Sequence, residues 1–345
     1  MASLTINLDS IEHNTRLVRN MIEPHGTRLV GVTKACLGDE AVAAAMLSAG
    51  AAALADSRPE SIRKLRRRFP DTELQLLRPP GDGSGAGDIP ADLFFVSNAG
   101  QARSSLSSGA GHQRRFLLMV ETGDGREGVP ADLAPAEAGK LAALEGAIPA
   151  GFATNAACSR PAAATAPALA LLMRTADMAR RQLGPVDGDP SFIISAGGSG
   201  LLRPAVGTAN DASPAGLDRL DDLRCGEALL LGRIPHGDHH DLFLPGGRRD
   251  AFLLDGSVLE VYRKNGDLRA LVDIGAQDTG SAPVIPCGDG VRVTSVTSDY
   301  LVASLESDSC RRRVRAGGSL SFIPTYYALL AAMTSPFIDK RYTGI

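Results

Sequence analysis

A lysine at the end of a short apolar run stands where a reactive group could act. Lys34 follows Leu29-Val30-Gly31-Val32-Thr33 and precedes a helical pattern that begins after Gly38. In a βα-barrel, the junction between a buried strand and the following helix lies on the face that carries chemistry. A desolvated lysine there can lose its proton and form a Schiff base. The alternative is a lysine whose stem packs on the strand end while its ammonium reaches water.

Two glycine-rich turns follow later apolar runs. Gly197-Gly198-Ser199 comes after the run that ends at Ser195, and Gly226 with Glu227 comes after Leu223-Arg224-Cys225. A glycine turn presents backbone N–H groups without side chains in the way, which suits a phosphate group. Phosphate sites in βα-barrels commonly use the loops after the seventh and eighth strands. The sequence therefore offers a phosphate site, unless these segments are tight turns only.

The composition favours a small molecule as the partner. The chain has 345 residues, 44% of them hydrophobic, which predicts one large domain with a smaller one. A formal net charge of -3 and a pI near 6.1 give no electrostatic case for nucleic acid or an anionic membrane. The basic run Arg63, Lys64, Arg66, Arg67 and Arg68 reads as a solvated helix face.

The cysteines and the first residues indicate a reducing, cytoplasmic setting. The five cysteines are scattered and never form a Cys-x-x-Cys pair, so we expect neither a disulfide framework nor a zinc site. The N-terminus lacks the basic head and apolar stretch of a signal peptide, and no segment reaches roughly 18 uninterrupted apolar residues. A cluster that could ligate a metal lacks a ligand framework, so we expect no metal there: His236, His239, His240, Asp238 and Asp241.

Short β-type runs alternate with helical patterns from Arg28 to about residue 231. Alternating βα units imply a parallel sheet, and eight of them in roughly 210 residues fit a closed (β/α)8 TIM-like barrel better than an open doubly wound sheet. Asp39 is suited to cap a helix over Glu40–Ser48 with Gly50 as its stop, and Asp9-Ser10 can start a helix through about Met21. The predicted strands cover about 29–33, 52–55, 74–77, 93–96, 115–121, 148–154, 192–195 and 223–231.

The pattern changes after Pro235. A mainly antiparallel β-domain is expected from Ala251–Tyr262, Leu268–Ile274, Val291–Leu305 and Ser319–Phe322, with Gly, Asn-Gly or Asp-Gly turns between them. The stretch at about 234–250, rich in Pro, Gly, His and Asp, is the predicted linker. We expect a barrel over 9–235 and a β-domain formed by 1–8 plus 245–345.

Eight short motifs occur in one order along the chain, most of them at the ends of predicted strands. They are Asn7–Asn14, Val32-Thr33-Lys34 with Gly38-Asp39, Asp56-Ser57-Arg58, Thr122–Gly128, Thr154–Cys158, Ser195–Ser199, Leu223–Glu227 and Met333-Thr334-Ser335-Pro336. In this order they resemble the fold-type III pyridoxal-phosphate enzymes, closest to the alanine/ornithine racemase family and its ornithine-racemase-like branch. The resemblance runs nearly from end to end.

The resemblance implies pyridoxal 5'-phosphate as the cofactor, with Lys34 holding it as a Schiff base. The residues that it places at the cofactor's phosphate, or as candidates for that contact, are Ser195, Gly197, Gly198, Ser199, Gly226, Glu227, Tyr326 and Tyr327. The family has asparagine where this chain has Gly198, so one side-chain contact of the family is missing here.

Arg224 is the residue most informative about the reaction type, because the resemblance places it against the pyridine nitrogen. A guanidinium stays protonated and can only donate, which leaves the ring unprotonated. An unprotonated ring is a weaker electron sink, so decarboxylation and transamination compete less well with return of a proton to the α-carbon. Fold-related decarboxylases have a carboxylate in this place. The alternative is that Arg224 pairs with Asp221 or Asp222.

Two further positions follow from the resemblance. It assigns Arg126, in the turn after the fifth strand, to the phenolic oxygen of the cofactor and to the substrate carboxylate, for which a bidentate guanidinium is suited. Alternatively, Arg126 is a surface arginine paired with Glu127 or Asp124. Asn155 occupies the ring-flanking place that a histidine holds in alanine racemases, and Met119 aligns with one of their lysines. Both differences separate this chain from alanine racemase proper.

Racemisation needs a second acid/base group on the face of the cofactor opposite Lys34. The resemblance places it in the β-domain of a partner subunit, which implies a homodimer with a shared active site. Thr297-Ser298-Asp299-Tyr300 stands where the pattern has Ser-Ser-Asp-His, so Tyr300 is the first candidate and Asp299 a candidate selector for a cationic side chain. On an alternating strand these two would point to opposite faces. Tyr300 could instead be a packed aromatic, and Tyr327 and Cys287 are further candidates.

These expectations describe a homodimeric, cytoplasmic, pyridoxal-phosphate amino-acid racemase that acts on a diamino acid or a small amino acid. Three alternatives stay open: a decarboxylase of the same fold, a non-catalytic pyridoxal-phosphate carrier, and a barrel enzyme that has lost its cofactor, which Gly198 would indicate. Carriers of this kind are typically a barrel alone, so the predicted β-domain argues against the second. The sequence predicts no nucleic-acid or membrane partner.

Overall fold

The computed structural model describes residues 2–79, 89–106, 113–155, 165–183, 192–205, 217–235 and 242–344. It divides into two compact units. The larger unit holds Glu12–Lys34 and Gly38–Gly247, and the smaller holds Met1–Ile11, Ala35–Leu37 and Arg248–Ile345. The division after Gly247 falls inside the stretch that the sequence predicts as the linker.

A closed ring of eight parallel strands forms the sheet of the larger unit. The strands are β2 (Arg28–Val32), β3 (Ala53–Asp56), β4 (Glu73–Leu76), β5 (Leu93–Val96), β6 (Arg114–Glu121), β8 (Ala147–Asn155), β9 (Ile193–Gly197) and β10 (Asp222–Cys225). Each pairs with the next, and β10 pairs with β2, which closes the ring. The predicted (β/α)8 barrel is therefore confirmed. Short β7 (Val129–Pro130) pairs with β6 outside the ring.

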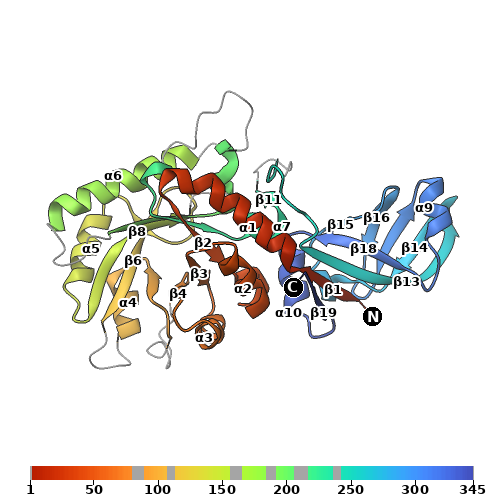
Figure 1. Cartoon of the computed structure of the whole chain (residues 1–345), viewed down its shortest axis with the longest axis horizontal. Helices are drawn as coiled ribbons and strands as arrows, with labels where there is room; N and C mark the ends of the chain where they lie inside the picture. Colours follow the sequence, from red (N-terminus) through yellow and green to blue (C-terminus); the bar gives the residue numbers. More distant parts are fainter. Residues whose placement is uncertain are drawn as a thin grey trace. The chain divides into compact units, whose positions relative to one another are not determined.

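Helices surround the strands of this unit (Figure 1). They are α1 (Leu8–Ile22), α2 (Glu40–Ser48), α3 (Pro59–Arg68), α4 (Ala99–Leu106), α5 (Ala134–Ala142), α6 (Thr165–Leu183) and α7 (Glu227–Leu231). The helix predicted over Glu40–Ser48 is confirmed as α2. Asp39 Oδ1 accepts the backbone N–H of Ala41 at 3.1 Å and of Val42 at 3.0 Å, so it satisfies two donors that the first turn leaves free.

The eighth predicted strand is too long. The sequence predicts a strand over 223–231, whereas the structure ends β10 at Cys225 and folds Glu227–Leu231 into α7. Both segments are buried, and a short, continuously apolar run does not distinguish a buried strand from a buried helix. The position of Gly226 between them marks the true boundary.

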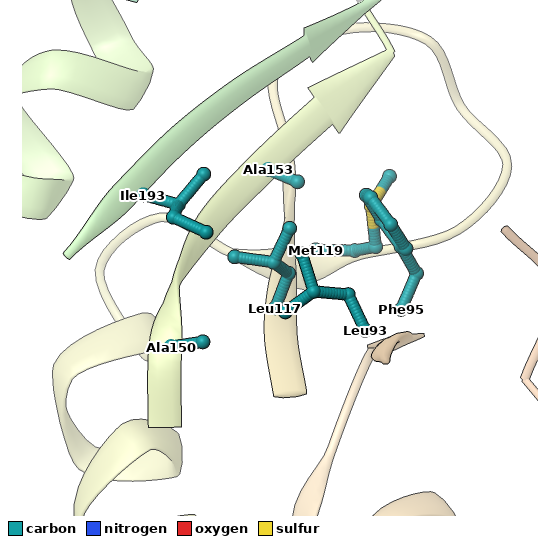
Figure 2. Close-up of a cluster of buried hydrophobic side chains, with 7 residues drawn as sticks. All are labelled: Leu93, Phe95, Leu117, Met119, Ala150, Ala153 and Ile193. Carbon is teal, nitrogen blue, oxygen red and sulfur yellow. The ribbon is translucent and has the colours of Figure 1, made fainter. Parts of the chain in front are cut away.

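The interior of the barrel is apolar where β5, β6, β8 and β9 meet. Figure 2 shows the buried side chains of this cluster: Leu93, Phe95, Leu117, Met119, Ala150, Ala153 and Ile193. Met119, where the resemblance implies a lysine, is 3% exposed and packs here as an ordinary core side chain. This position of the barrel therefore carries no charge.

The smaller unit is a mainly antiparallel β-sheet, as the sequence predicts. Its strands are β1 (Ser3–Asn7), β13 (Phe252–Lys264), β14 (Asp267–Val272), β15 (Val284–Pro286), β16 (Val291–Val296), β17 (Leu301–Leu305), β18 (Ser319–Pro324) and β19 (Asp339–Thr343). The order is β15-β18-β13-β14-β17-β16, and β1 joins β13 antiparallel and β19 parallel. Three helices accompany the sheet: α8 (Ala276–Thr279), α9 (Asp308–Arg313) and α10 (Tyr326–Thr334).

One predicted strand of this unit is interrupted. The sequence predicts extended structure over Val291–Leu305, but β16 and β17 form a hairpin, and Thr297–Tyr300 is the turn between them. Thr297 and Tyr300 close this turn through a 2.7 Å hydrogen bond from the Thr297 N–H to the Tyr300 carbonyl. The expectation that Asp299 and Tyr300 alternate across a strand is therefore wrong, because neither residue lies in one.

The predicted linker contains a short pair of strands, β11 (Arg233–Ile234) and β12 (Leu242–Phe243). Residues 236–241, which include the histidine and aspartate cluster named above, lie outside the described residues, as does Cys158.

Within the described ranges, no group of three or more His, Cys, Asp or Glu side chains could hold a metal ion. Across the same ranges, every helix is too short or too polar to cross a membrane.

Candidate active site

Five of the residues singled out in the sequence lie at the carboxyl ends of the barrel strands. Lys34 follows β2, Arg126 lies in the turn after β6, Asn155 ends β8, Ser195 lies in β9 and Arg224 in β10. Because the eight strands are parallel, these strand ends form one rim, which is the face of such barrels that carries active sites. The closed ring also makes β9, β10 and β2 consecutive neighbours.

Lys34 begins a short 3-10 turn, Lys34–Cys36, directly after β2. Its side chain is partly buried. Nothing within the described part of the chain forms a hydrogen bond or an ion pair with its ammonium group. A partly buried lysine at a barrel rim, without a carboxylate partner there, is suited to react with a carbonyl compound.

Arg224 lies inside the barrel and is 3% exposed. Its Nη1 donates to Ser195 Oγ at 2.5 Å, and its Nη2 donates to the Thr154 carbonyl at 2.7 Å and to Asn155 Oδ1 at 3.3 Å. The guanidinium also stands 4.6 Å from the centre of the Phe95 ring. Acceptors on the two strands β8 and β9 and one aromatic ring therefore fix the direction of this cation.

The two aspartates considered as partners of Arg224 make other contacts. Asp222, fully buried, accepts from Arg28 at 2.8 Å and from Gln75 at 2.9 Å. Asp221 accepts the backbone N–H of Ile194 at 2.7 Å. Burial raises the pKa of the Asp222 carboxyl, and the charge of Arg28 opposes that rise. The structure thus gives both carboxylates structural roles in the barrel.

Gly197 allows Arg224 and Asn155 to meet. A Cβ at this position would lie 2.7 Å from both Arg224 Nη2 and Asn155 Oδ1, closer than such atoms approach. Sequence reasoning assigned Gly197 to a phosphate turn and missed this packing requirement. It also missed Thr154 and Phe95 as contacts of Arg224, although a polar residue at the end of a buried strand is a signal that could have indicated Thr154.

Asn155 links Arg224 to the turn after β6. Its Oδ1 accepts from Arg224 while its Nδ2 donates to Glu127 Oε1. In that turn, Arg126 is exposed, and its Nε lies 2.5 Å from Asp124 Oδ2 and 3.7 Å from Glu127 Oε2. The alternative considered for Arg126, pairing within its own turn, is what the structure shows. Its contact with a substrate carboxylate stays a prediction.

The two glycine turns lie side by side. The N–H of Gly198 donates to the Arg224 carbonyl at 3.0 Å, and Ser199 Oγ accepts the N–H of Ala228 at 3.0 Å. Ser199 Oγ also lies 3.2 Å from Cys225 Sγ. Gly198 has φ +112°, a conformation that glycine adopts readily and asparagine does not. The hydroxyl of Ser199 is thus used to join the loops after β9 and β10.

Glu227 opens α7 beside these turns. Burial raises the pKa of its carboxyl to about 7, and the charge of Arg233 opposes that rise. Burial also raises the pKa of the neighbouring Cys225 thiol to about 11, which keeps the thiol protonated. Glu227 is the group of this region whose charge changes near neutral pH.

The remaining predicted residues belong to the smaller unit. Asp299 accepts from Gln277 Nε2 at 3.0 Å and from Ser298 Oγ at 2.7 Å, and Tyr300 beside it is 42% exposed. Tyr327, at the start of α10, is 71% exposed and packs edge to face on Tyr326 at 5.6 Å between ring centres.

Cys287 of the smaller unit is exposed, and partial burial with the charge of Asp255 raises the pKa of its thiol. A thiol with a raised pKa is a poor nucleophile and a poor base at neutral pH. Tyr300 and Cys287 both stay candidates for the second acid/base group.

Comparisons with known proteins agree on one family. Residues 6–228 match the family described as alanine racemase, N-terminal domain. A lysine racemase of Thermotoga maritima is 29% identical, and an ornithine racemase of Acetoanaerobium sticklandii is 24% identical, each over 98% of both chains.

Solved structures share the fold. An alanine racemase from Corynebacterium glutamicum superposes with a TM-score of 0.73 at 20% identity, covering 99% of both chains. A D-threonine aldolase from Filomicrobium marinum superposes with a TM-score of 0.76 at 17% identity, covering 96% of this chain and 89% of the other. At these identities the likeness shows the fold alone.

Proposed function

The chain belongs to the family of the alanine racemase N-terminal domain, and from that premise we propose that it is an amino-acid racemase that uses pyridoxal 5'-phosphate and acts on a diamino acid. The observation that carries the proposal is the arrangement of the rim. A lysine without a partner among the described residues and two joined glycine turns stand on the consecutive strands β9, β10 and β2.

The residues present fit the cofactor. Lys34 supplies a primary amine at the rim, and the loops after β9 and β10, which Gly198 and Ser199 join, are where backbone N–H groups would hold a phosphate. Because the Ser199 hydroxyl is occupied between the loops, we assign the phosphate to the backbone of these turns. Tyr327 stays a candidate for a phosphate contact. Arg224 supplies a fixed donor for a ring nitrogen, and Asn155 flanks the same place.

The mechanism follows from the protonation of these groups. When bound, pyridoxal phosphate supplies the electron sink that makes the α-proton of an amino acid removable. Lys34 Nζ moves that proton on one face and Tyr300 Oη of a partner subunit moves it on the other. Arg224 keeps its own proton and donates only, so it restrains the electron sink and favours return of the proton to the α-carbon.

The rest of the site positions the substrate. Arg126 binds the α-carboxylate after its guanidinium leaves Asp124, since the fork of an arginine fits a carboxylate. Asp299 binds the distal ammonium of a diamino acid. The names of the two relatives, lysine racemase and ornithine racemase, support this substrate class. We place the enzyme in the cytoplasm as a homodimer, with 9–235 as the barrel and 1–8 plus 245–345 as the β-domain.

The experiment is to reduce the purified protein with borohydride, map the labelled peptide and assay each L-amino acid by chiral chromatography. We expect pyridoxyl on Lys34, and racemisation of lysine and ornithine ahead of alanine. Lys34→Ala should abolish both label and activity, whereas Lys64→Ala, in α3, should retain them. A label on Lys64, Lys140, Lys264 or Lys340, or the absence of any racemisation, would contradict the proposal.

A further inference from the structure

The buried carboxylate of Asp56 accepts a hydrogen bond from Thr33, the residue that precedes Lys34. Thr33 Oγ1 donates to Asp56 Oδ2 at 2.7 Å, and the Thr33 N–H donates to the Ala55 carbonyl at 2.9 Å. Asp56 ends β3, the neighbour of β2 in the ring. Both Thr33 and Asp56 have no exposed surface. The strand end from which Lys34 projects is therefore tied to the next strand by its side chain as well as its backbone.

Asp56 receives several donors. Its Oδ1 accepts the N–H of Arg58 at 3.0 Å, and the N–H of Ser57 and the hydroxyl of Ser61 also donate to the carboxylate. Burial raises the pKa of the Asp56 carboxyl, and these hydrogen bonds oppose the rise. A carboxyl group that only accepts hydrogen bonds is bound in its ionised form. Every described contact of this group thus uses it as an acceptor.

The loop after Lys34 is held against the same element. A Cβ on Gly38 would lie 2.8 Å from Ser61 Cβ, so the end of the loop packs closely on the first turn of α3. The N–H of Gly38 donates back to the Thr33 carbonyl at 3.4 Å. Asp56 is the group that joins the two sides, because it contacts Thr33 at the start of the loop and Ser61 beneath its end.

We propose that Asp56, acting through the Thr33 hydroxyl, is a positioning residue for Lys34 in proton transfer. This inference rests on the proposed function of Lys34. A lysine side chain has four methylene groups and many rotamers, so its nitrogen reaches a given α-carbon reproducibly only when the backbone beneath it is fixed. Neither Asp56 nor Thr33 touches the substrate in this proposal.

The test compares the removal of two hydroxyl groups that donate to the same carboxylate. Thr33→Val removes the one next to Lys34, and Ser61→Ala removes one from α3 as the matched control. We expect both holoenzymes to bind cofactor fully and to lose similar thermal stability. Thr33→Val should lower kcat by about 10- to 100-fold with KM nearly unchanged. Ser61→Ala should keep kcat, and Thr33→Ser, which retains the hydroxyl, should restore it.

An isotope effect separates positioning from general loosening. The equilibrium constant of racemisation is one, so kcat/KM falls equally in both directions whatever the cause. Removal of the α-proton by Lys34 concerns only one enantiomer. In Thr33→Val, the primary isotope effect should therefore rise for the α-deuterated enantiomer of lysine from which Lys34 removes the deuteron. For the other enantiomer it should fall, because delivery of a solvent proton by Lys34 then limits the rate. An equal change for both enantiomers would overturn the proposal.

A double-mutant cycle tests the route through Thr33. Asp56→Asn and the double variant Asp56→Asn/Thr33→Val should lower kcat to the same extent, because the second change removes nothing more. If the fold-losses of kcat in the two single variants multiply in the double variant, the two residues act separately and the proposal is wrong. If the wild-type enzyme carries no pyridoxyl label on Lys34, or does not racemise an amino acid, the proposed function itself is refuted. Wild-type racemisation with Thr33→Val equal to Ser61→Ala would refute this inference alone.

Discussion

Arg224 carries its positive charge inside the barrel, where acceptors come from the main chain and from side-chain oxygens. The Thr154 carbonyl, Ser195 and Asn155 each accept from it, and the ring of Phe95 lies against it. A buried cation in such a setting stays protonated, because a guanidinium does not release its proton in proteins. In the proposed mechanism, the reaction type depends on Arg224 as a donor that cannot become an acceptor.

Replacing that donor should change the partition of products. Arg224→Glu offers a carboxylate, which favours a protonated ring and a stronger electron sink, so racemisation should weaken and abortive transamination should rise. Arg224→Lys keeps the charge and should lose rate without raising transamination. The measurement is pyridoxamine phosphate formed per turnover in the three proteins. An unchanged ratio in Arg224→Glu would show that Arg224 does not face the ring nitrogen.

Glu227 is the residue whose titration links pH to stability. Burial raises the pKa of its carboxyl from 4.5 to about 7, so between these values the folded protein binds a proton that the unfolded chain has released. The free energy of unfolding of the wild type should therefore fall as the pH rises through this window. The shift corresponds to at most about 3 kcal/mol.

Glu227→Gln removes the titration, and its stability relative to the wild type should increase between pH 4.5 and 7. Urea unfolding at several pH values, without added cofactor, measures the difference. At pH values below this window both proteins carry an uncharged side chain, and their stabilities should be most alike. A difference that stays constant across the window would show that Glu227 titrates as an exposed carboxylate.

At the scale of elements, the hairpin turn Thr297–Tyr300 is held by the first turn of α8. Ala276 and Gln277 donate their N–H groups to the carbonyls of Thr297 and Ser298 at 2.8 and 3.1 Å. Gly275 lies so close that a Cβ there would stand 2.1 Å from the Ser298 oxygen. The turn that carries Tyr300 and Asp299 is thus a docked segment, which suits residues that must meet a substrate in one orientation.

Gly275→Ala should displace this turn. Its φ of -128° is open to any residue, so the effect is steric, and we expect a loss of about 1–3 kcal/mol in stability. Racemisation should fall while borohydride labelling of Lys34 stays complete, because the change lies in the smaller unit. The absorbance of the bound cofactor and a chiral assay of racemisation check these two expectations. If Gly275→Ala loses cofactor binding to the same extent as activity, the turn does not act on racemisation alone and this prediction is wrong.

At the scale of the whole molecule, the described residues of the smaller unit expose several large apolar side chains. They are Leu37, Leu259, Ile285, Val296, Tyr300, Tyr327, Phe337 and Tyr342. Large contiguous apolar patches mark protein–protein contacts, whereas apolar side chains exposed singly are common on any protein surface. The proposed homodimer, in which the β-domain of one subunit completes the site of the other, is tested by experiment.

A complementation experiment tests the shared site. Lys34→Ala and Tyr300→Phe should each be inactive, yet a mixture that exchanges subunits should recover activity. In each hybrid dimer one site combines an intact Lys34 with an intact Tyr300 of the other subunit. Random exchange with two-fold symmetry makes half of the dimers hybrid, so we expect about a quarter of the wild-type activity. If Tyr300 acts within its own subunit, the mixture stays inactive.

The sequence by itself determined the barrel and the positions of its functional residues along the chain. Strands buried on both faces are continuous apolar runs, so all eight barrel strands could be located, and Lys34 and the glycine turns followed from their ends. Local signals were sufficient for α2, whose cap Asp39 lies one residue before it. They failed at α7 and at the turn Thr297–Tyr300, where burial and hairpin pairing override the local pattern.

Only the tertiary structure decided which residues meet. Arg224 contacts Thr154 across 70 residues of chain and Ser195 across 29, and Thr33 reaches Asp56 across 23. The sequence shows that each of these residues ends or occupies a strand, but the closure of the ring and its register set the pairs. Because side-chain contacts between parallel strands depend on that register, the acceptors of Arg224 and the anchor beneath Lys34 could not be predicted from the spacing of the residues.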